Sequence, residues 1–125
     1  PDQPVRIARF LGAIEIAQAS PPRVDAAVGA DWVDELIVKD AEAGAARVLF
    51  HSIAYQYFPD ASKQRIAARM DEAGQAATPE APLAWLAFEQ FQRKGPRLTL
   101  RLWPGGEQCI LARADAHGRK IEWLD

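Results

Sequence analysis

The stretch Arg47-Val48-Leu49-Phe50-His51-Ser52-Ile53 decides the fold class. Its apolar residues follow one another without a polar alternation, which is typical of a strand covered on both faces in an α/β protein. A second run of this kind occupies residues 83–88, and a helix is predicted between the two from Pro59-Asp60 to Gly74. Because strands alternate with helices, the sequence predicts a parallel sheet with covering helices.

Upstream of this stretch, the pattern predicts a helix, a short strand and a second helix. Asp2 and Pro4 favour a helix start, and Ser20-Pro21-Pro22 ends that helix. Residues 24–28 are a short strand candidate. Asp31 is the expected N-cap of the second helix. The first helix carries an apolar stripe at helical spacing, formed by Ile7, Leu11 and Ile14 with Phe10 and Ala17 beside them.

Downstream, the last thirty residues predict an antiparallel meander. Three leucines alternate with other residues over positions 98–103, which is the pattern of a half-exposed strand. Pro104-Gly105-Gly106 favours a turn, residues 109–114 a return strand, and residues 120–124 a final strand after a turn at 115–118. The predicted fold is therefore one α/β domain over residues 1–125, with a mixed, Rossmann-like sheet.

Composition narrows the classes of partner. The 125 residues carry 15 Lys and Arg against 17 Asp and Glu, for a net charge of −2. This balance argues against nucleic acid or an anionic membrane surface as a partner held by a positive field. No apolar run approaches the ~20 residues of a membrane span. A single cysteine and two histidines argue against a disulfide framework and a multi-ligand metal site, and favour a reducing, cytoplasmic setting.

The segment 51–58 is the first candidate site, because ligands bind beyond the carboxyl ends of parallel strands. His51 is the catalytic candidate, as a base or an orienting group, and Ser52, Tyr55 and Tyr57 are candidate substrate contacts. The structural alternative is that a backbone carbonyl satisfies a buried His51 while the two tyrosines pack under the next helix. His51 and Ser52 are adjacent on a strand, so their side chains point to opposite faces and form no dyad.

Two further positions have a functional and a structural interpretation. Glu89-Gln90 ends the strand at 83–88, where a carboxylate would bind an amine or a hydroxyl, or would simply meet water, which we favour. Cys109 is expected to be a small core residue, and the alternative is a nucleophile. The sequence has no G-x-G-x-x-G after a strand, no phosphate-binding loop of the Walker type and no H-E-x-x-H.

Several motifs together resemble one bacterial family. They are Pro1-Asp2-Gln3-Pro4 before Arg6-Ile7-Ala8-Arg9, residues 50–53 with 55–59, residues 101–106 and residues 112–118. This set is similar to the C-terminal half of the uncharacterised family called domain of unknown function 2332. The resemblance covers essentially the whole chain and implies a longer protein. The start at Pro1, with Met70 as the sole methionine, agrees with a fragment or a processed chain.

The layout of that family is similar to class I S-adenosylmethionine-dependent methyltransferases. The similarity implies that residues 24–28 are the third strand, that Asp31 lies near the cofactor's adenine, and that residues 51–58 contact substrate. The glycine-rich cofactor segment would belong to the part upstream, so no cofactor is expected in this chain alone. Only residues 91–96 separate the strand at 83–88 from the meander, where those enzymes carry another helix.

These observations lead to one hypothesis with two alternatives. The first is the C-terminal half of a methyltransferase-like bacterial protein that acts on a small molecule. The second is a non-catalytic ligand-binding or assembly module on the same fold, and the third is a hydrolase dependent on Cys109. Because a sheet cut from a larger one exposes apolar surface, we also expect the chain to self-associate, as a two-fold dimer.

Overall fold

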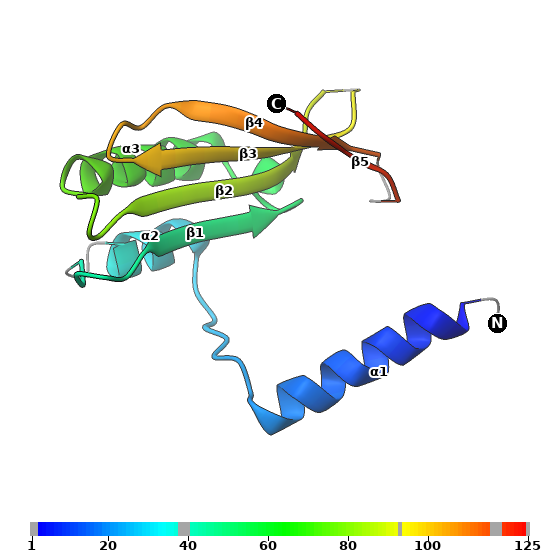
Figure 1. Ribbon diagram of the computed structural model, residues 1–125. Helices are drawn as coiled ribbons and strands as arrows, with labels where there is room; N and C mark the ends of the chain where they lie inside the picture. The colour runs from blue at the N-terminus through cyan, green and yellow to red at the C-terminus, as the bar shows by residue number, and fades with distance from the viewer. Residues whose placement is uncertain (1–2, 38–40, 93, 116–118, 125) are drawn as a thin grey trace.

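The structure, a computed structural model, describes residues 3–37, 41–92, 94–115 and 119–124. Its elements follow one another as helices α1 (Pro4–Ala19) and α2 (Gly29–Ile37), strand β1 (Arg47–Ser52), the 3-10 helix η1 (Tyr55–Tyr57), helix α3 (Asp60–Gln75), and strands β2 (Leu83–Gln90), β3 (Pro96–Trp103), β4 (Gln108–Ala114) and β5 (Ile121–Trp123). The strands form one mixed sheet in the order β1-β2-β3-β4-β5 (Figure 1). The chain is thus α/β, as the sequence predicts.

The sheet contains one parallel pair, β1 with β2, and its other pairs are antiparallel. Parallel neighbours need a long crossover, and η1 and α3 supply it between β1 and β2. The remaining strands follow as the predicted meander, with a bulge between Leu98 and Thr99 in the β3–β4 pairing. The predicted parallel sheet is therefore limited to its first two strands.

Helices α2 and α3 pack beside each other on one face of the sheet, which we call the covered face (Figure 1). The side chains of α3 that meet the sheet recur every four residues, at Ile66, Met70 and Gly74. A Cβ atom on Gly74 would lie 2.4 Å from the ring of Trp103, so the missing side chain lets helix and strand approach closely. The core cluster of this layer comprises Ala30, Val33, Ile37, Leu49, Ile66, Met70, Leu83 and Trp103.

No helix contacts the other face of the sheet in the described part of the chain, and we call it the open face. The pairing register places Phe50, Leu86, Leu100 and Cys109 in one row across this face. Its large apolar residues are Val48, Phe50, Leu86, Phe88, Leu98, Leu100, Leu102, Ile121 and Trp123. The leucines of the alternating β3 pattern thus lie on the open face, and Trp103 lies in the core.

Helix α1 stands apart from the sheet (Figure 1). The predicted helix is confirmed, with Pro4 in its first turn, but none of its residues is buried. Its apolar stripe is exposed, and residues 20–28 run as an exposed connection to α2. Asp2, the expected capping residue, lies outside the described residues.

The strand predicted at residues 24–28 is wrong. The segment has no regular structure, and Val24 and Val28 are exposed. The physical reason is the lack of a partner: β1 is the edge of the described sheet, and no strand lies beside its free edge. The second helix also begins two residues before Asp31, at Gly29, so Asp31 lies in the first turn rather than at the N-cap.

Candidate functional site

The turn after β1 directs three consecutive backbone N–H groups toward one carboxylate. Ile53 has a positive φ of 47°, which turns the chain sharply into η1. The N–H groups of Ala54 and Tyr55 each donate to Glu89 Oε1 at 3.0 Å, and that of Gln56 donates to Oε2 at 3.4 Å. The first N–H groups of a helical turn have no partner within it, so an acceptor at that end satisfies them. Glu89 of β2 therefore fixes the turn.

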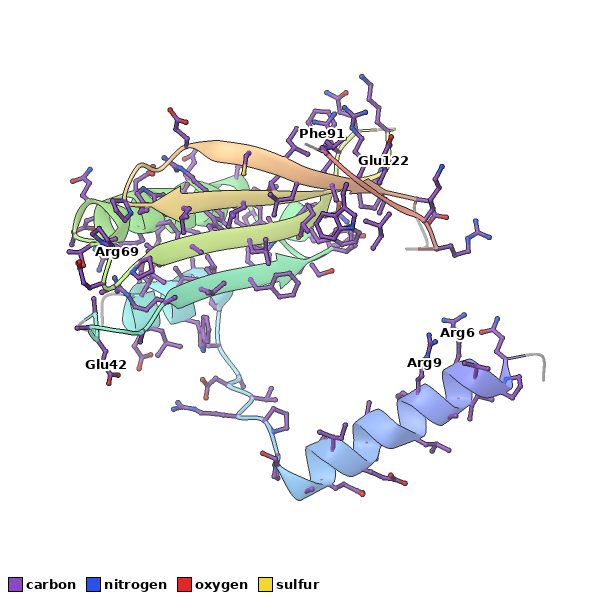
Figure 2. All side chains as sticks on the ribbon, in the orientation of Figure 1. Arg6, Arg9, Glu42, Arg69, Phe91 and Glu122 are labelled. Carbon is purple, nitrogen blue, oxygen red and sulfur yellow. The ribbon has the colours of Figure 1, made fainter. Side chains whose placement is uncertain are left out.

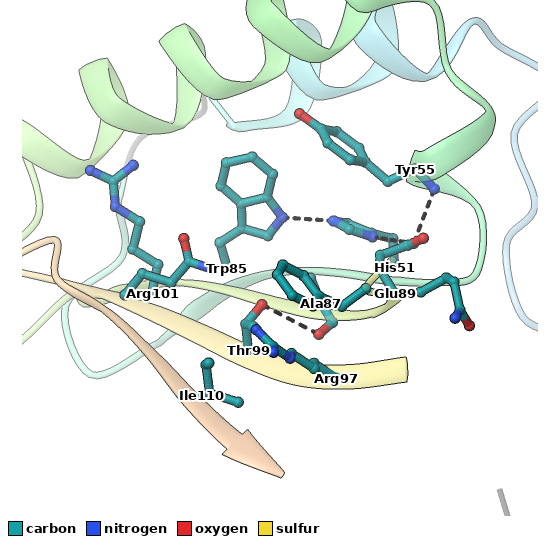
Figure 3. A pocket seen from close by; sticks show the side chains of 12 residues that line it. His51, Tyr55, Trp85, Ala87, Glu89, Arg97, Thr99, Arg101 and Ile110 are labelled. Atoms are coloured by element: carbon teal, nitrogen blue, oxygen red, sulfur yellow. Dashed lines mark hydrogen bonds and ion pairs between the residues drawn. The ribbon is translucent and has the colours of Figure 1, made fainter. Parts of the chain in front are cut away.

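His51 connects Glu89 to Trp85 in a chain of side-chain hydrogen bonds (Figure 3). The indole N–H of Trp85 donates to His51 Nε2 at 2.8 Å, and His51 Nδ1 lies 2.8 Å from Glu89 Oε1. Because Nε2 accepts a hydrogen bond, a neutral imidazole carries its proton on Nδ1 and donates it to the carboxylate. Both ring nitrogens of His51 are therefore already engaged.

Burial and hydrogen bonding act in opposite directions on Glu89. Burial raises the pKa of the carboxyl, but hydrogen bonds from the Ala54 N–H, His51 and the N–H groups of Tyr55 and Gln56 outweigh it. The net result is a pKa below the ordinary value. Glu89 is thus ionised at neutral pH, where an anion best accepts these donors.

Tyr55 packs on the other side of the imidazole. Its ring stacks on His51 with centroids 4.8 Å apart, and its hydroxyl donates to the Lys63 carbonyl of α3 at 2.8 Å. Burial raises the pKa of the Tyr55 phenol, which keeps it a neutral donor. The turn after β1 is therefore anchored to β2 through Glu89 and to α3 through Tyr55.

A cavity of about 330 Å³ opens beside this network on the covered face (Figure 3). It lies toward the carboxyl ends of β1 and β2, where ligand sites of α/β sheets occur. Twelve residues line it: His51, Tyr55, Trp85, Ala87, Glu89, Gln90, Phe91, Arg97, Thr99, Arg101, Gln108 and Ile110. Tyr55, Trp85, Ala87, Phe91 and Ile110 supply aromatic and aliphatic surface, and the other lining residues carry polar groups. Small-molecule pockets combine apolar walls with polar groups in this way.

The two arginines of the cavity differ in their partners. Arg101 forms an ion pair with Asp71 at 2.6 Å and donates to the Gly106 carbonyl at 2.5 Å. The guanidinium of Arg97 lies over the Phe91 ring, 3.4 Å from its centroid, and among the described residues it has no acidic partner. The β2–β3 register places Arg97 directly opposite Glu89, but no ion pair joins them, so among the described residues Arg97 is the cation of this cavity without an ion pair.

The structure brings together two of the predicted site residues. His51 and Tyr55 line the cavity. Ser52 is exposed on the opposite side of β1, and Tyr57 is exposed outside the cavity. Asp31 on α2 forms an ion pair with Arg65 of α3 at 2.7 Å.

Sequence reasoning missed Arg97 and Trp85, and its interpretation of Glu89 as a solvated strand end is wrong. Glu89 is inside β2 and only 17% of its side chain is exposed. Residues 85, 87 and 89 alternate with 84, 86 and 88, so they share a face with His51. The β2–β3 pairing places Glu89 opposite Arg97, and this register cannot be predicted from the sequence pattern alone. The histidine does have internal partners, but they are side chains rather than a backbone carbonyl.

Cys109 does not face this network. It is exposed on the open face, where its thiol donates to the Leu100 carbonyl at 3.5 Å. His51 lies on the covered face, so it is no base for that thiol, and His117 lies outside the described residues. Within the described residues, no group of three or more His, Cys, Asp or Glu side chains would hold a metal ion.

None of the described helices combines the length and apolar character that crossing a membrane requires.

The described residues do not fit the cradle of an S-adenosylmethionine cofactor. Asp31, the expected adenine contact, is already paired with Arg65. The positive-φ glycines described are Gly44 before β1, Gly95 before β3, and Gly105 and Gly106 in the β3–β4 turn. Gly95 follows the carboxyl end of β2 but leads into strand β3, whereas such a cradle is a glycine-rich loop that leads from a parallel strand into a helix. We therefore derive no chemical step through this cofactor.

Fold and cavity together define an α/β protein with a small-molecule-sized pocket on the covered face of a mixed sheet. Comparison with protein families matches residues 1–123 to the family described as "Uncharacterized protein conserved in bacteria (DUF2332)". The chain belongs to that family. No curated protein and no solved structure matches it significantly.

Proposed function

We propose that this chain is a binding module for a small molecule that has an aromatic or apolar body and one anionic group. The observation that carries the proposal is Arg97, a cation without an acidic partner in the described structure, at a cavity walled by aromatic rings. An arginine binds a carboxylate or phosphate in a bidentate manner, and a neighbouring ring keeps its planar head oriented.

The cavity walls determine the rest of the ligand. Trp85, Phe91 and Ile110 offer flat and apolar surface, and the volume of about 330 Å³ is at the small end of ligand pockets. Thr99 and Gln108 add polar groups on the same side as Arg97. A substituted aromatic acid is the kind of molecule that satisfies both features.

The hydrogen bonding of His51 favours binding over proton transfer. A general base needs a free nitrogen within reach of the substrate proton. Nε2 of His51 accepts from Trp85 and Nδ1 donates to Glu89, so the imidazole would have to give up the indole before acting as a base. In this proposal the Trp85–His51–Glu89 chain holds the pocket wall in place.

Benzoate and its uncharged counterpart benzamide test the proposal. Titration into the 125-residue chain is followed by two-dimensional NMR, with the indole N–H signal of Trp85 as the local probe. We expect benzoate to shift this signal and benzamide to bind at least about tenfold more weakly, because one charge-assisted contact contributes roughly 1.5–3 kcal/mol.

Matched arginine variants locate the contact. Arg97→Ala should weaken benzoate binding by about tenfold or more. Arg9→Ala on α1 removes the same charge outside the cavity and should leave binding unchanged. Equal affinity for the two probes, or benzoate binding that Arg97→Ala does not affect, would overturn the proposal.

A second candidate is the substrate-binding part of an S-adenosylmethionine-dependent methyltransferase-like protein. The observation that favours it is the position of His51 and Tyr55 in the cavity at the carboxyl ends of the parallel pair. On this proposal the glycine-rich cofactor segment lies outside these residues, and the exposed Ser52 and Tyr57 and the Asp31 position contact groups supplied with it.

Calorimetric titration separates the two candidates. S-adenosylmethionine and its demethylated product are titrated into this chain and into a longer member of the family. The methyltransferase proposal predicts binding by the longer protein alone. No binding by the longer protein would remove it, and tight binding by this chain would contradict the expected place of the cofactor.

A further inference from the structure

Two apolar surfaces of this chain have no partner within the described structure. One is the stripe of α1, and the other is the open face of the sheet. In Figure 2 the side chains of α1 project with no other element beside them, and no helix lies on the open face of the sheet. The two surfaces come from separate parts of the sequence. The stripe of α1 has no apolar surface to pack against, and the open face has no helix to cover it.

Helix α1 has a surface built for contact. At 100° per residue, Ile7, Phe10, Leu11 and Ile14 share one side of the helix, and their exposed fractions are 54, 66, 53 and 38%. A 16-residue helix is marginally stable alone in water, because most helix stability in proteins comes from packing an apolar face. The stripe therefore needs a cover.

The open face has the complementary character. Antiparallel sheets that face water normally carry polar residues on that side. The positions that register assigns to the open face in β1–β5 hold no charged residue. Phe50, Leu102 and Trp123 remain 57, 48 and 68% exposed there. A continuous uncharged surface of this kind marks an interaction site.

The dimensions of the two surfaces agree. A helix of 16 residues is about 24 Å long, and the eight-residue strands β2 and β3 are about 27 Å long. Two helix-on-sheet contacts of this length bury roughly 1,000 Å² in total, which is the area at which specific interfaces begin. One helix along the strands therefore covers the middle of the open face.

We infer that α1 of one copy packs on the open face of a second copy, and that the two copies exchange these helices about a two-fold axis. Helix α2 packs beside β1 on the covered face, so returning α1 to its own open face requires the connection to bend around the free β1 edge. Pro21 and Pro22 stiffen the connection at residues 20–28, and α1 extends away from its own sheet (Figure 1). That connection spans at most about 30 Å, enough to reach a facing copy.

Light scattering coupled to size exclusion tests the exchange with the full 125-residue chain. The chain should be a dimer, and Phe10→Asp should raise its dissociation constant by about tenfold or more, because an interface core tolerates no unpaired charge. Ile16→Asp is the matched control on the other side of α1, where Ile16 is 71% exposed, and should leave the dimer intact. On the sheet, Phe50→Lys should dissociate the dimer and Tyr57→Lys should not.

Mixing the two dissociating variants gives the sharpest result. Phe10→Asp retains a normal open face and Phe50→Lys retains a normal helix, so the mixture should form a heterodimer through one intact contact. Circular dichroism checks that each variant is folded, which we expect because both side chains are exposed in the single chain. A strict monomer at high concentration, or a dimer that Phe10→Asp leaves unchanged, would overturn the inference.

Discussion

The face of the sheet that carries charged residues is the one covered by helices, and the uncharged face is the one left open. The covered face contains His51, Glu89, Arg97 and Arg101, yet it holds the core. The open face holds no charged residue, yet Val48, Phe50, Leu102, Ile121 and Trp123 are exposed there. Apolar content therefore does not decide which face of the sheet a helix covers. The crossover between β1 and β2 decides it, because α3 must lie on one side of that parallel pair.

Glu89 and Arg101 are tolerated on the covered face because each has a partner there. Glu89 accepts from the turn after β1, and Arg101 pairs with Asp71 of α3. Charged groups next to a core are stable when they are paired and hydrogen-bonded. The open face has no such network, so its stability depends on what lies against it.

The largest expected effect comes from equal truncations on the two faces. Leu83 on the covered face is fully buried, and Leu102 on the open face is 48% exposed. Leu83→Ala should lower the free energy of unfolding by about 2–5 kcal/mol, because it leaves a cavity. Leu102→Ala should cost less than about 1 kcal/mol in the dissociated chain. Urea unfolding at low protein concentration measures both losses, and similar values would contradict the difference in burial between the two faces.

An intermediate effect is expected at Glu89. Glu89→Gln retains the shape but loses the charge that three backbone N–H groups and His51 contact, and should cost roughly 1.5–3 kcal/mol. Glu107→Gln removes an exposed carboxylate and serves as the control. The amide protons of Ala54 and Tyr55 should exchange faster in Glu89→Gln, and unchanged exchange would contradict the anchoring role.

The smallest effect is a pH dependence confined to the covered face. The pKa of Glu89 is lowered in the folded chain from its ordinary value of 4.5. The unfolded state therefore binds the proton more readily, so this contribution to stability is complete above the ordinary pKa and is lost as pH falls through the folded value. The difference in unfolding free energy between wild type and Glu89→Gln should shrink as the solution is acidified below that range. Phe50→Lys has no such pH dependence, and a constant Glu89→Gln difference in acid would argue against an ionised Glu89.

Local patterns were enough to predict most elements. The apolar runs gave β1 and β2, the Pro59-Asp60 start gave α3, and the turn at Pro104-Gly105-Gly106 gave the β3–β4 hairpin. The strand prediction for residues 24–28 is wrong because a strand forms only beside a neighbouring strand. The local sequence does not show whether such a neighbour is present. The same applies to α1, which is correctly a helix but whose stripe does not show what it packs against.

Only the part of the candidate site that is close in sequence could be predicted. His51 and Tyr55 are close in sequence, so their neighbourhood could be inferred. Glu89 lies 38 positions from His51 and meets it through the β1–β2 register, and Arg97 enters through the next strand. Long-range pairing is what turns these scattered side chains into one pocket.

The exposed thiol on β4 is a natural chemical probe of the open face. Cys109 is the sole cysteine of the chain, and the register sets it in the row of Phe50, Leu86 and Leu100. Its alkylation rate therefore measures, without any engineered label, how often the surface around it is shielded from solvent. Slower alkylation at higher protein concentration would report the opening and closing of the assembly. Storage in air without a reductant would let oxygen oxidise two such thiols to a disulfide between molecules, which a thiol reductant reverses.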